Sequence, residues 1–290
     1  MKNYLILICS VFTLCSCQKE NSNDNIVPAD PVLLKKFIEL DPASTPPNDT
    51  VSIREYSYDN LGRCVSIKNL YFPGMEVDYT YNYYNGADSL MASRTLLYDG
   101  SSDTSKEIFT YSANGLLLSD STVTISTGGT NSLVYKYNES NGLIRSEISL
   151  NGQPFMIASY EVQRDINGNI TFESDSSFEY LAGSGYVYRD VSDITNSYDN
   201  NPCPFYKLYP KRLVELDYEN ALADDVPFYW SIPQRNNILS EARITSPITS
   251  GLTPYNHSFS YTYHANGYPS MVLYFDNLTG DAYKGIYLYE

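Results

Sequence analysis

Aromatic and polar residues alternate in several short stretches of the chain. Tyrosine or phenylalanine occupies every second position in each stretch: Tyr56/Tyr58, Tyr79/Tyr81/Tyr83, Phe109/Tyr111, Tyr135/Tyr137 and Tyr261/Tyr263. This period of two predicts β-strands that carry their rings on one face of a sheet. Helical periodicity is weak, and the best candidate for a helix is residues 213–225.

The turns that follow these strands share one form. A residue that accepts a backbone hydrogen bond tends to open the turn, as Asp59 does, and a glycine closes it three positions later. This form predicts a type I turn followed by a glycine bulge, because glycine tolerates positive φ without a Cβ clash. His264 occupies the opening position of one copy, so we expect it to have a turn role. The closing glycines are Gly62, Gly115, Gly142, Gly168 and Gly267.

The first four of these glycines reveal a repeat. They are separated by 53, 27 and 26 residues, and the first interval equals two periods. Further turns fall near the half-periods, at residues 73–75, 99–103, 127–130, 151–154 and 181–185. The pattern predicts an all-β fold over residues 32–290, an antiparallel meander of β-hairpins that forms one long, curled sheet. Residues 191–255 lack the repeat and are predicted to be an irregular, loop-rich insertion.

The first residues of the chain indicate export. Lys2 precedes an apolar run that is too short for a permanent membrane span, and the run ends in Leu14-Cys15-Ser16-Cys17. This ending resembles the lipobox of bacterial lipoproteins. The resemblance implies a signal peptide at residues 1–16, lipid on Cys17 and attachment to a membrane without spanning it. Residues 17–31 are polar and read as a flexible tether.

The repeat resembles the YD repeats of Rhs-type proteins, and the copy Tyr58-Asp59-Asn60-Leu61-Gly62-Arg63 matches every fixed position of that unit. The lipobox, the stretch YDNNPCPF at 198–205, the Asn236-Asn237 pair and YHANGYPS at 263–270 resemble Bacteroidota lipoproteins with degenerate YD-like repeats. Lys19-Glu20 resembles the surface-export signal of that group. The resemblance implies an outer-membrane lipoprotein, exposed at the cell surface, with a sheet that curls on itself. It carries over no catalytic residue.

Charge and cysteine content limit the partners. The net charge is −15, which disfavours nucleic acid and anionic lipid headgroups. Five cysteines are present, and cleavage before Cys17 would leave only Cys64 and Cys203 beyond the lipidated residue. An exported protein permits a disulfide between them, but the sequence favours two thiols.

Side chains for catalysis or metal binding are sparse. Only His257 and His264 are present, which disfavours histidine-dependent catalysis and a His-rich zinc site, and we expect His257 at the surface. Asp276, Asn277 and Asp281 could offer oxygens to calcium, but a hairpin turn explains them with fewer assumptions. No cofactor or metal is predicted. Acids that could form a catalytic pair in the irregular region are Glu215 with Asp217 and Asp224 with Asp225.

Aromatic residues in the irregular region provide the candidate ligand site. Trp230, Tyr229, Phe228 and Tyr206 could stack on sugar rings if exposed, or could plug the end of the sheet. The leading prediction is a non-enzymatic binding or structural module of the cell envelope, for a glycan or a protein. The alternative is a hydrolase, such as a glycoside hydrolase, with its carboxylates in residues 191–255.

Overall fold

The chain divides into two units, Met1–Val32 and Leu33–Glu290, and the strands all belong to the second. The structure is a computed structural model. It describes residues 32–46, 49–83, 90–98, 104–113, 115, 117–124, 128–137, 143–207, 234–246 and 254–290.

The described residues form sixteen strands and one short 3₁₀ helix, η1. In chain order these are β1 Leu34–Leu40, β2 Thr50–Tyr58, β3 Cys64–Tyr71, β4 Met75–Tyr83, β5 Met91–Tyr98, β6 Thr104–Tyr111, β7 Leu117–Thr124, β8 Thr130–Tyr137, β9 Leu143–Leu150, β10 Gln153–Arg164, β11 Ile170–Leu181, β12 Gly185–Pro202, η1 Pro204–Lys207, β13 Asn236–Ser246, β14 Tyr255–Tyr263, β15 Pro269–Asp276 and β16 Ala282–Tyr289.

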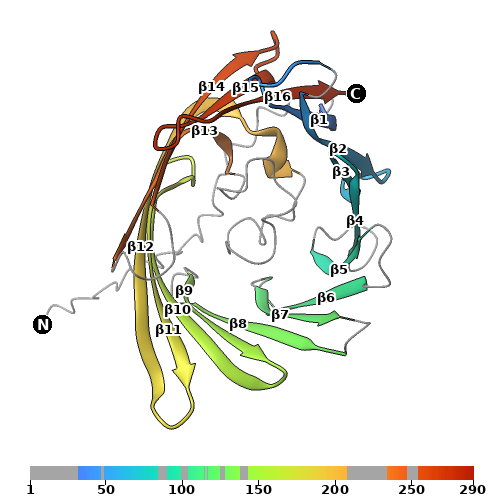
Figure 1. Cartoon of the computed structure of the whole chain (residues 1–290). Coiled ribbons are helices and arrows are strands. Elements are labelled where there is room, and N and C mark those ends of the chain that lie inside the picture. The colour runs from blue at the N-terminus through green and yellow to red at the C-terminus, as the bar shows by residue number, and fades with distance from the viewer. Residues whose placement is uncertain are drawn as a thin grey trace, which may run out of the picture. The chain divides into compact units, whose positions relative to one another are not determined.

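The meander closes on itself. Each strand pairs antiparallel with the next, and β1 pairs with β16, so the sheet is a closed barrel (Figure 1). The all-β, antiparallel prediction is confirmed, whereas the open curled sheet is wrong. Phe37 opposite Tyr287 belongs to the pairing that closes the ring. Closure removes the two unpaired edges that an open meander would expose to other chains.

The region predicted to be irregular also contains regular structure. β12 is 18 residues long and extends to Pro202, and β13 begins at Asn236 and continues to Ser246. The prediction of an irregular segment over the whole of 191–255 is therefore wrong for these strands. These strands pair with their neighbours as the other strands do. The spacing of turns in the sequence does not predict them. The candidate helix at 213–225 lies outside the described residues.

The predicted turns form one rim of the barrel. Gly62, Gly115, Gly168 and Gly267 all have positive φ, between 74° and 87°. At Asp59, the side-chain Oδ1 accepts the Leu61 N–H at 2.9 Å, and the backbone C=O accepts the Gly62 N–H at 3.0 Å. A register shift accompanies each of these four turns, as the glycine bulge requires. Gly142 lies outside the described residues.

We call this edge the YD rim. It also carries the start of β1 and the end of β16, because an antiparallel meander returns to the same edge after every two strands. The half-period turns lie on the opposite rim. Asn151 and Gly152 form one of them, with φ values of 50° and 76°. The second family of turns is therefore confirmed where the structure describes it.

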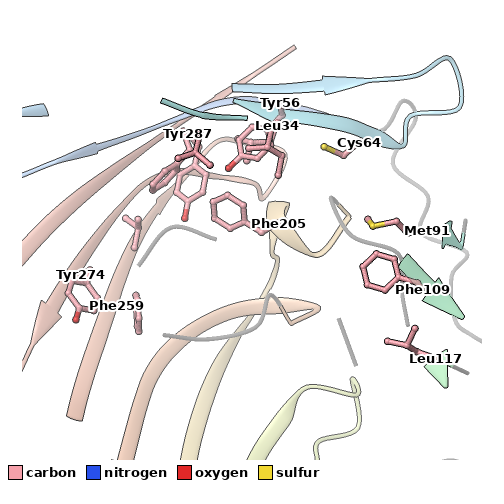
Figure 2. Close-up of a cluster of buried hydrophobic side chains, with 14 residues drawn as sticks. Leu34, Tyr56, Cys64, Met91, Phe109, Leu117, Phe205, Phe259, Tyr274 and Tyr287 are labelled. Carbon is pink, nitrogen blue, oxygen red and sulfur yellow. The ribbon is translucent and has the colours of Figure 1, made fainter. Parts of the chain in front are cut away.

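The inner side of the wall carries the apolar core. Phe205 of η1 packs against Phe37, Tyr56 and Tyr287, with ring centroids 5.5, 6.4 and 5.6 Å from its own. Figure 2 shows Phe205 beside Tyr56 and Tyr287. Cys64 belongs to the same buried cluster, and Cys203 packs against it. Both are thiols in the described structure, as the sequence favours. The residues 198–205 thus turn the chain from the wall into the interior.

Candidate functional site

The inner face of β11 to β14 holds a group of charged and aromatic side chains, which we call the lumenal charge cluster. Cross-strand pairing arranges it in two adjacent rows. One row runs from Glu173 through Ile194 and Arg243 to Tyr255, and the other places Glu241 opposite His257. Glu173 and Glu241 each expose 1% of their surface, and His257 exposes none. Strand register therefore brings five polar side chains together in the interior: Glu173, Glu241, Arg243, Tyr255 and His257.

Stacked rings connect the members of the cluster. The Arg243 guanidinium carbon lies 4.8 Å from the centroid of the Tyr255 ring, a cation–π contact. The Tyr255 ring stacks on His257 at 4.4 Å, and His257 lies 5.1 Å from Tyr274. Charge and ring faces thus alternate across the inner face of β13, β14 and β15.

Burial dominates the titration of the cluster. Burial, opposed by the nearby carboxylate of Asp276 and assisted by the charge of Arg243, lowers the pKa of His257 to about 4. Burial and then the charge of Glu241 raise the pKa of Tyr255 well above its usual range. At neutral pH the imidazole is therefore uncharged and the phenol protonated. A catalytic carboxylate pair needs room for substrate and water, and Glu173 and Glu241 are enclosed. This geometry favours a structural role for the cluster.

A second polar network explains the YDNN stretch and the Asn236-Asn237 pair. The Asp199 carboxylate accepts hydrogen bonds from the Asn201 N–H at 2.9 Å, from the Asn237 N–H at 3.1 Å and from the Tyr263 hydroxyl. Asn236 donates its N–H to Asn169 Oδ1 at 3.1 Å. These bonds join the ends of β12, β13 and β14 to the β10–β11 turn. The network positions η1 and its Phe205, so these motif residues serve the fold.

The predicted site residues have different outcomes. Trp230, Tyr229 and Phe228 lie outside the described residues, as do Cys17 and the four candidate acids Glu215, Asp217, Asp224 and Asp225. Tyr206 is partly buried and packs against the apolar core. The described residues around Tyr206 do not form a ligand site with it.

The two histidines also differ. His264 opens its turn as predicted, because its backbone C=O accepts the Gly267 N–H at 3.0 Å. The predicted surface position of His257 is wrong, because β14 turns this side chain towards the interior, opposite Glu241. Asp276 accepts the Leu278 N–H at 2.8 Å in a hairpin turn, which confirms the simpler interpretation of residues 276–281.

Glu173, Glu241 and Arg243 were not predicted as a group. They do alternate with neighbours in their strands, but alternation alone does not tell which face is buried. Pairing between β11, β12 and β13 makes that choice. In the described part of the chain, no three His, Cys, Asp or Glu side chains are placed to hold a metal ion. No helix among the described residues is both long and apolar enough to cross a membrane.

The fold is an up-and-down antiparallel barrel. It is similar in outline to a porin-like protein from Bacteroides uniformis, at 12% identity and a TM-score of 0.48, over 90% of this chain and 98% of that one. A porin-like protein from Bacteroides vulgatus gives 11% identity and a TM-score of 0.46, over 90% and 99%. A TcdB2–TccC3–Cdc42 crystal structure gives 9% identity and a TM-score of 0.28, over 84% and 14%.

No family model matches the chain, and no curated protein matches it in sequence. The similar structures are too distant to assign a function.

Proposed function

We propose that this chain is a non-enzymatic module of the cell envelope, held to a membrane by lipid on Cys17, with a barrel wall that faces water. Its role is binding or scaffolding, for a glycan or protein ligand. The observation that carries the proposal is the distribution of polarity across the wall. The inside holds the apolar cluster together with buried charged groups, and the outside carries charged and hydroxyl pairs among exposed apolar residues such as Leu97, Leu273 and Leu288.

Cross-strand pairs on the outer face support this orientation. Lys36 pairs with Glu55 at 2.6 Å, and each alternates with a buried neighbour such as Phe37 or Arg54. Lys68 pairs with Glu76 at 2.8 Å on the next hairpin. A charged side chain on the lipid face of a barrel costs about 2–4 kcal/mol near the bilayer midplane. Ion pairs on successive hairpins therefore favour a wall in water.

Hydroxyl pairs continue the polar outer face around the barrel. The hydroxyl oxygens of Thr110 and Ser119 lie 2.6 Å apart between β6 and β7. Those of Ser197 and Ser240 lie 2.6 Å apart between β12 and β13. Such cross-strand pairs stabilise a solvated sheet face. A barrel with this outer face needs a separate device to stay at a membrane. The expected lipid on Cys17 supplies it.

Selective cleavage of the tether tests the orientation of the wall. A recognition site for a sequence-specific protease is inserted between Asn25 and Ile26, and isolated outer membranes are treated with the protease. We expect the fragment that carries the barrel to appear in the supernatant after dilution. The unsubstituted protein serves as control and should stay with the membranes. A cleaved fragment that only detergent releases from the membranes would overturn the proposal, because the wall itself would then be embedded.

The anchor is tested separately with two cysteine variants. Metabolic labelling with a fatty acid should mark the wild type and Cys15→Ser, and should miss Cys17→Ser. Cys15 is the matched control because it lies two positions away, inside the expected signal peptide. Equal labelling of the two variants would contradict lipidation at Cys17.

A further inference from the structure

The β11–β12 hairpin extends beyond the wall on the rim opposite the YD rim (Figure 1). β10 pairs with β11 only as far as Met156 opposite Glu179, and β13 pairs with β12 only from Ser246 opposite Val191. Among the described residues, residues 180–188, which we call the tip ribbon, therefore have strand partners only within the hairpin. Tyr180 lies opposite Tyr186 there. Both faces of the ribbon lie outside the barrel wall.

The tip ribbon is uncharged and apolar on both faces. Its nine residues, YLAGSGYVY, lie between Glu179 and Arg189. Tyr180, Tyr186 and Tyr188 continue the outer face of the wall, and Leu181 and Val187 continue the inner face. These five side chains each expose between 39% and 49% of their surface. A contiguous exposed group of this kind marks an interaction surface.

Tyrosine pairs hold the ribbon in shape. Tyr180 and Tyr186 meet edge to face with centroids 5.3 Å apart, and Phe178 and Tyr188 meet at 5.7 Å. Cross-strand aromatic pairs stabilise a two-stranded ribbon that would otherwise be marginal. They do not account for Leu181 and Val187, which face the other way. A role in supporting the hairpin therefore explains the aromatic face of the ribbon but not its aliphatic face.

The other turns that the structure describes expose single apolar residues. Leu278 is exposed in the β15–β16 turn of the same rim, but Asp276 and Asp281 flank it. On the YD rim, Leu61 and Ile166 are exposed beside Asp59 and Asp165. Single exposed apolar residues are normal at protein surfaces. The tip ribbon differs because its exposed residues are contiguous and carry no charge.

We propose that the tip ribbon inserts into the interfacial layer of a lipid bilayer. Tyrosine is enriched at membrane–water interfaces because its ring is apolar and its hydroxyl is polar. Leu181 and Val187 would enter the acyl region, and Glu179 and Arg189 would limit the depth of insertion. The net charge of −15 gives no general attraction to anionic lipids, so burial of apolar surface drives the contact.

The inference rests on the proposed function, because the lipid on Cys17 keeps the barrel near the bilayer. The stretch from Cys17 to Leu33 spans up to roughly 55 Å when extended, about twice the length of an eight-residue strand. The anchor therefore permits the opposite rim to reach the same membrane. A tethered second contact needs little affinity of its own, because the tether raises its effective concentration.

The chemistry of the ribbon favours lipid over a glycan. A sugar chain stacks on one aromatic face and needs polar partners beside it. The ribbon offers rings on one face and bare aliphatic side chains on the other. A bilayer interface accommodates both faces at once.

A fluorescent probe at the tip tests insertion. Ser184→Cys, at the turn of the ribbon, is labelled with an environment-sensitive fluorophore in the full-length lipidated protein, reconstituted in phosphatidylcholine vesicles. Thr279→Cys, in the β15–β16 turn of the same rim, is the matched site. Labelling of the unsubstituted protein measures the background from the native thiols. We expect a shift to shorter wavelength, and quenching by quencher-bearing lipids, at position 184 only.

Charge substitutions at exposed positions complete the test. Leu181→Glu should abolish the shift at position 184, and Leu278→Glu should leave it unchanged. A probe at 184 that stays water-like in protein shown by mass spectrometry to be lipidated would overturn the inference and leave the proposed function intact. A shift that depends on protein concentration and not on lipid would indicate self-association and would also overturn it. A chain without lipid on Cys17 would overturn both proposals.

Discussion

The imidazole of His257 lies parallel to the phenol ring of Tyr255, with centroids 4.4 Å apart and 6° between the planes. The guanidinium of Arg243 already lies over the Tyr255 ring. Protonation of His257 would add a second cation to this buried stack. The folded state therefore favours the neutral imidazole, and this preference couples the stability of the barrel to pH.

We expect the free energy of unfolding to decrease as the pH falls below about 6.5. The folded pKa of His257 is about 4, below its ordinary value of 6.5. Between these values the unfolded chain binds a proton that the folded chain does not, so stability falls with falling pH. The full difference corresponds to about 3 kcal/mol. Urea unfolding midpoints measured from pH 7.5 to 4 would reveal it.

The other histidine provides the control for this pH dependence. His257→Gln should flatten the decrease between pH 6.5 and 4, and His264→Gln should retain it, because His264 is exposed in a turn. If His257→Gln unfolds with the same pH slope as the wild type, the buried imidazole is not the source.

Gly285 is predicted to be irreplaceable for a packing reason. A Cβ at this position would lie 2.6 Å from Phe37 Cε2 and 2.7 Å from Val272 Cγ1, and closer still to Phe37 Cζ. Gly285→Ala should therefore destabilise the barrel by about 1–3 kcal/mol through overpacking. Phe37→Leu should destabilise the wild type but recover part of the loss in Gly285→Ala. Additive effects in this double-mutant cycle would contradict the contact.

Gly62 is predicted to be required for a conformational reason. Its φ is 74°, and a Cβ there would meet no atom within 4 Å. Gly62→Ala should cost about 1 kcal/mol through backbone strain alone. Asn60→Ala, in the same turn and exposed, should change the free energy of unfolding by less than about 0.5 kcal/mol. Thermal or urea unfolding of the two variants measures both, and equal costs would refute the assigned turn.

Local chemistry explains why the sequence predicted the YD rim so well. Asp59 and Gly62 specify their turn within a few residues, so the turn and the strands beside it can be read without knowledge of distant segments. Closure is different, because it depends on Phe37 meeting Tyr287 across nearly the whole chain. A pattern of alternation allows both an open sheet and a ring.

The same limit explains the missed charge cluster. His257 and Glu241 belong to stretches that alternate as solvated strands do, and only their pairing across β13 and β14 shows that they face inwards. The aromatic-rich segment where the repeat ends resembles a binding loop, so the sequence favours it as the ligand site. The tip ribbon instead belongs to a regular hairpin, where its aromatic alternation has the same appearance as any strand.

The buried ion pair between Arg94 and Glu107 provides a final test of the interior. Arg94 Nη2 lies 2.7 Å from Glu107 Oε2, and both side chains face inwards and are largely buried. Arg94→Met should destabilise the barrel by about 3–5 kcal/mol, because it leaves a buried carboxylate without its partner. Arg94→Met with Glu107→Met should recover most of that loss. The exposed pair Lys35–Glu290 is the control, and Lys35→Met should cost less than about 1 kcal/mol. The free energies of unfolding are measured in urea. Similar losses for Arg94→Met and Lys35→Met would contradict a buried pair, and with it the inward orientation of these side chains.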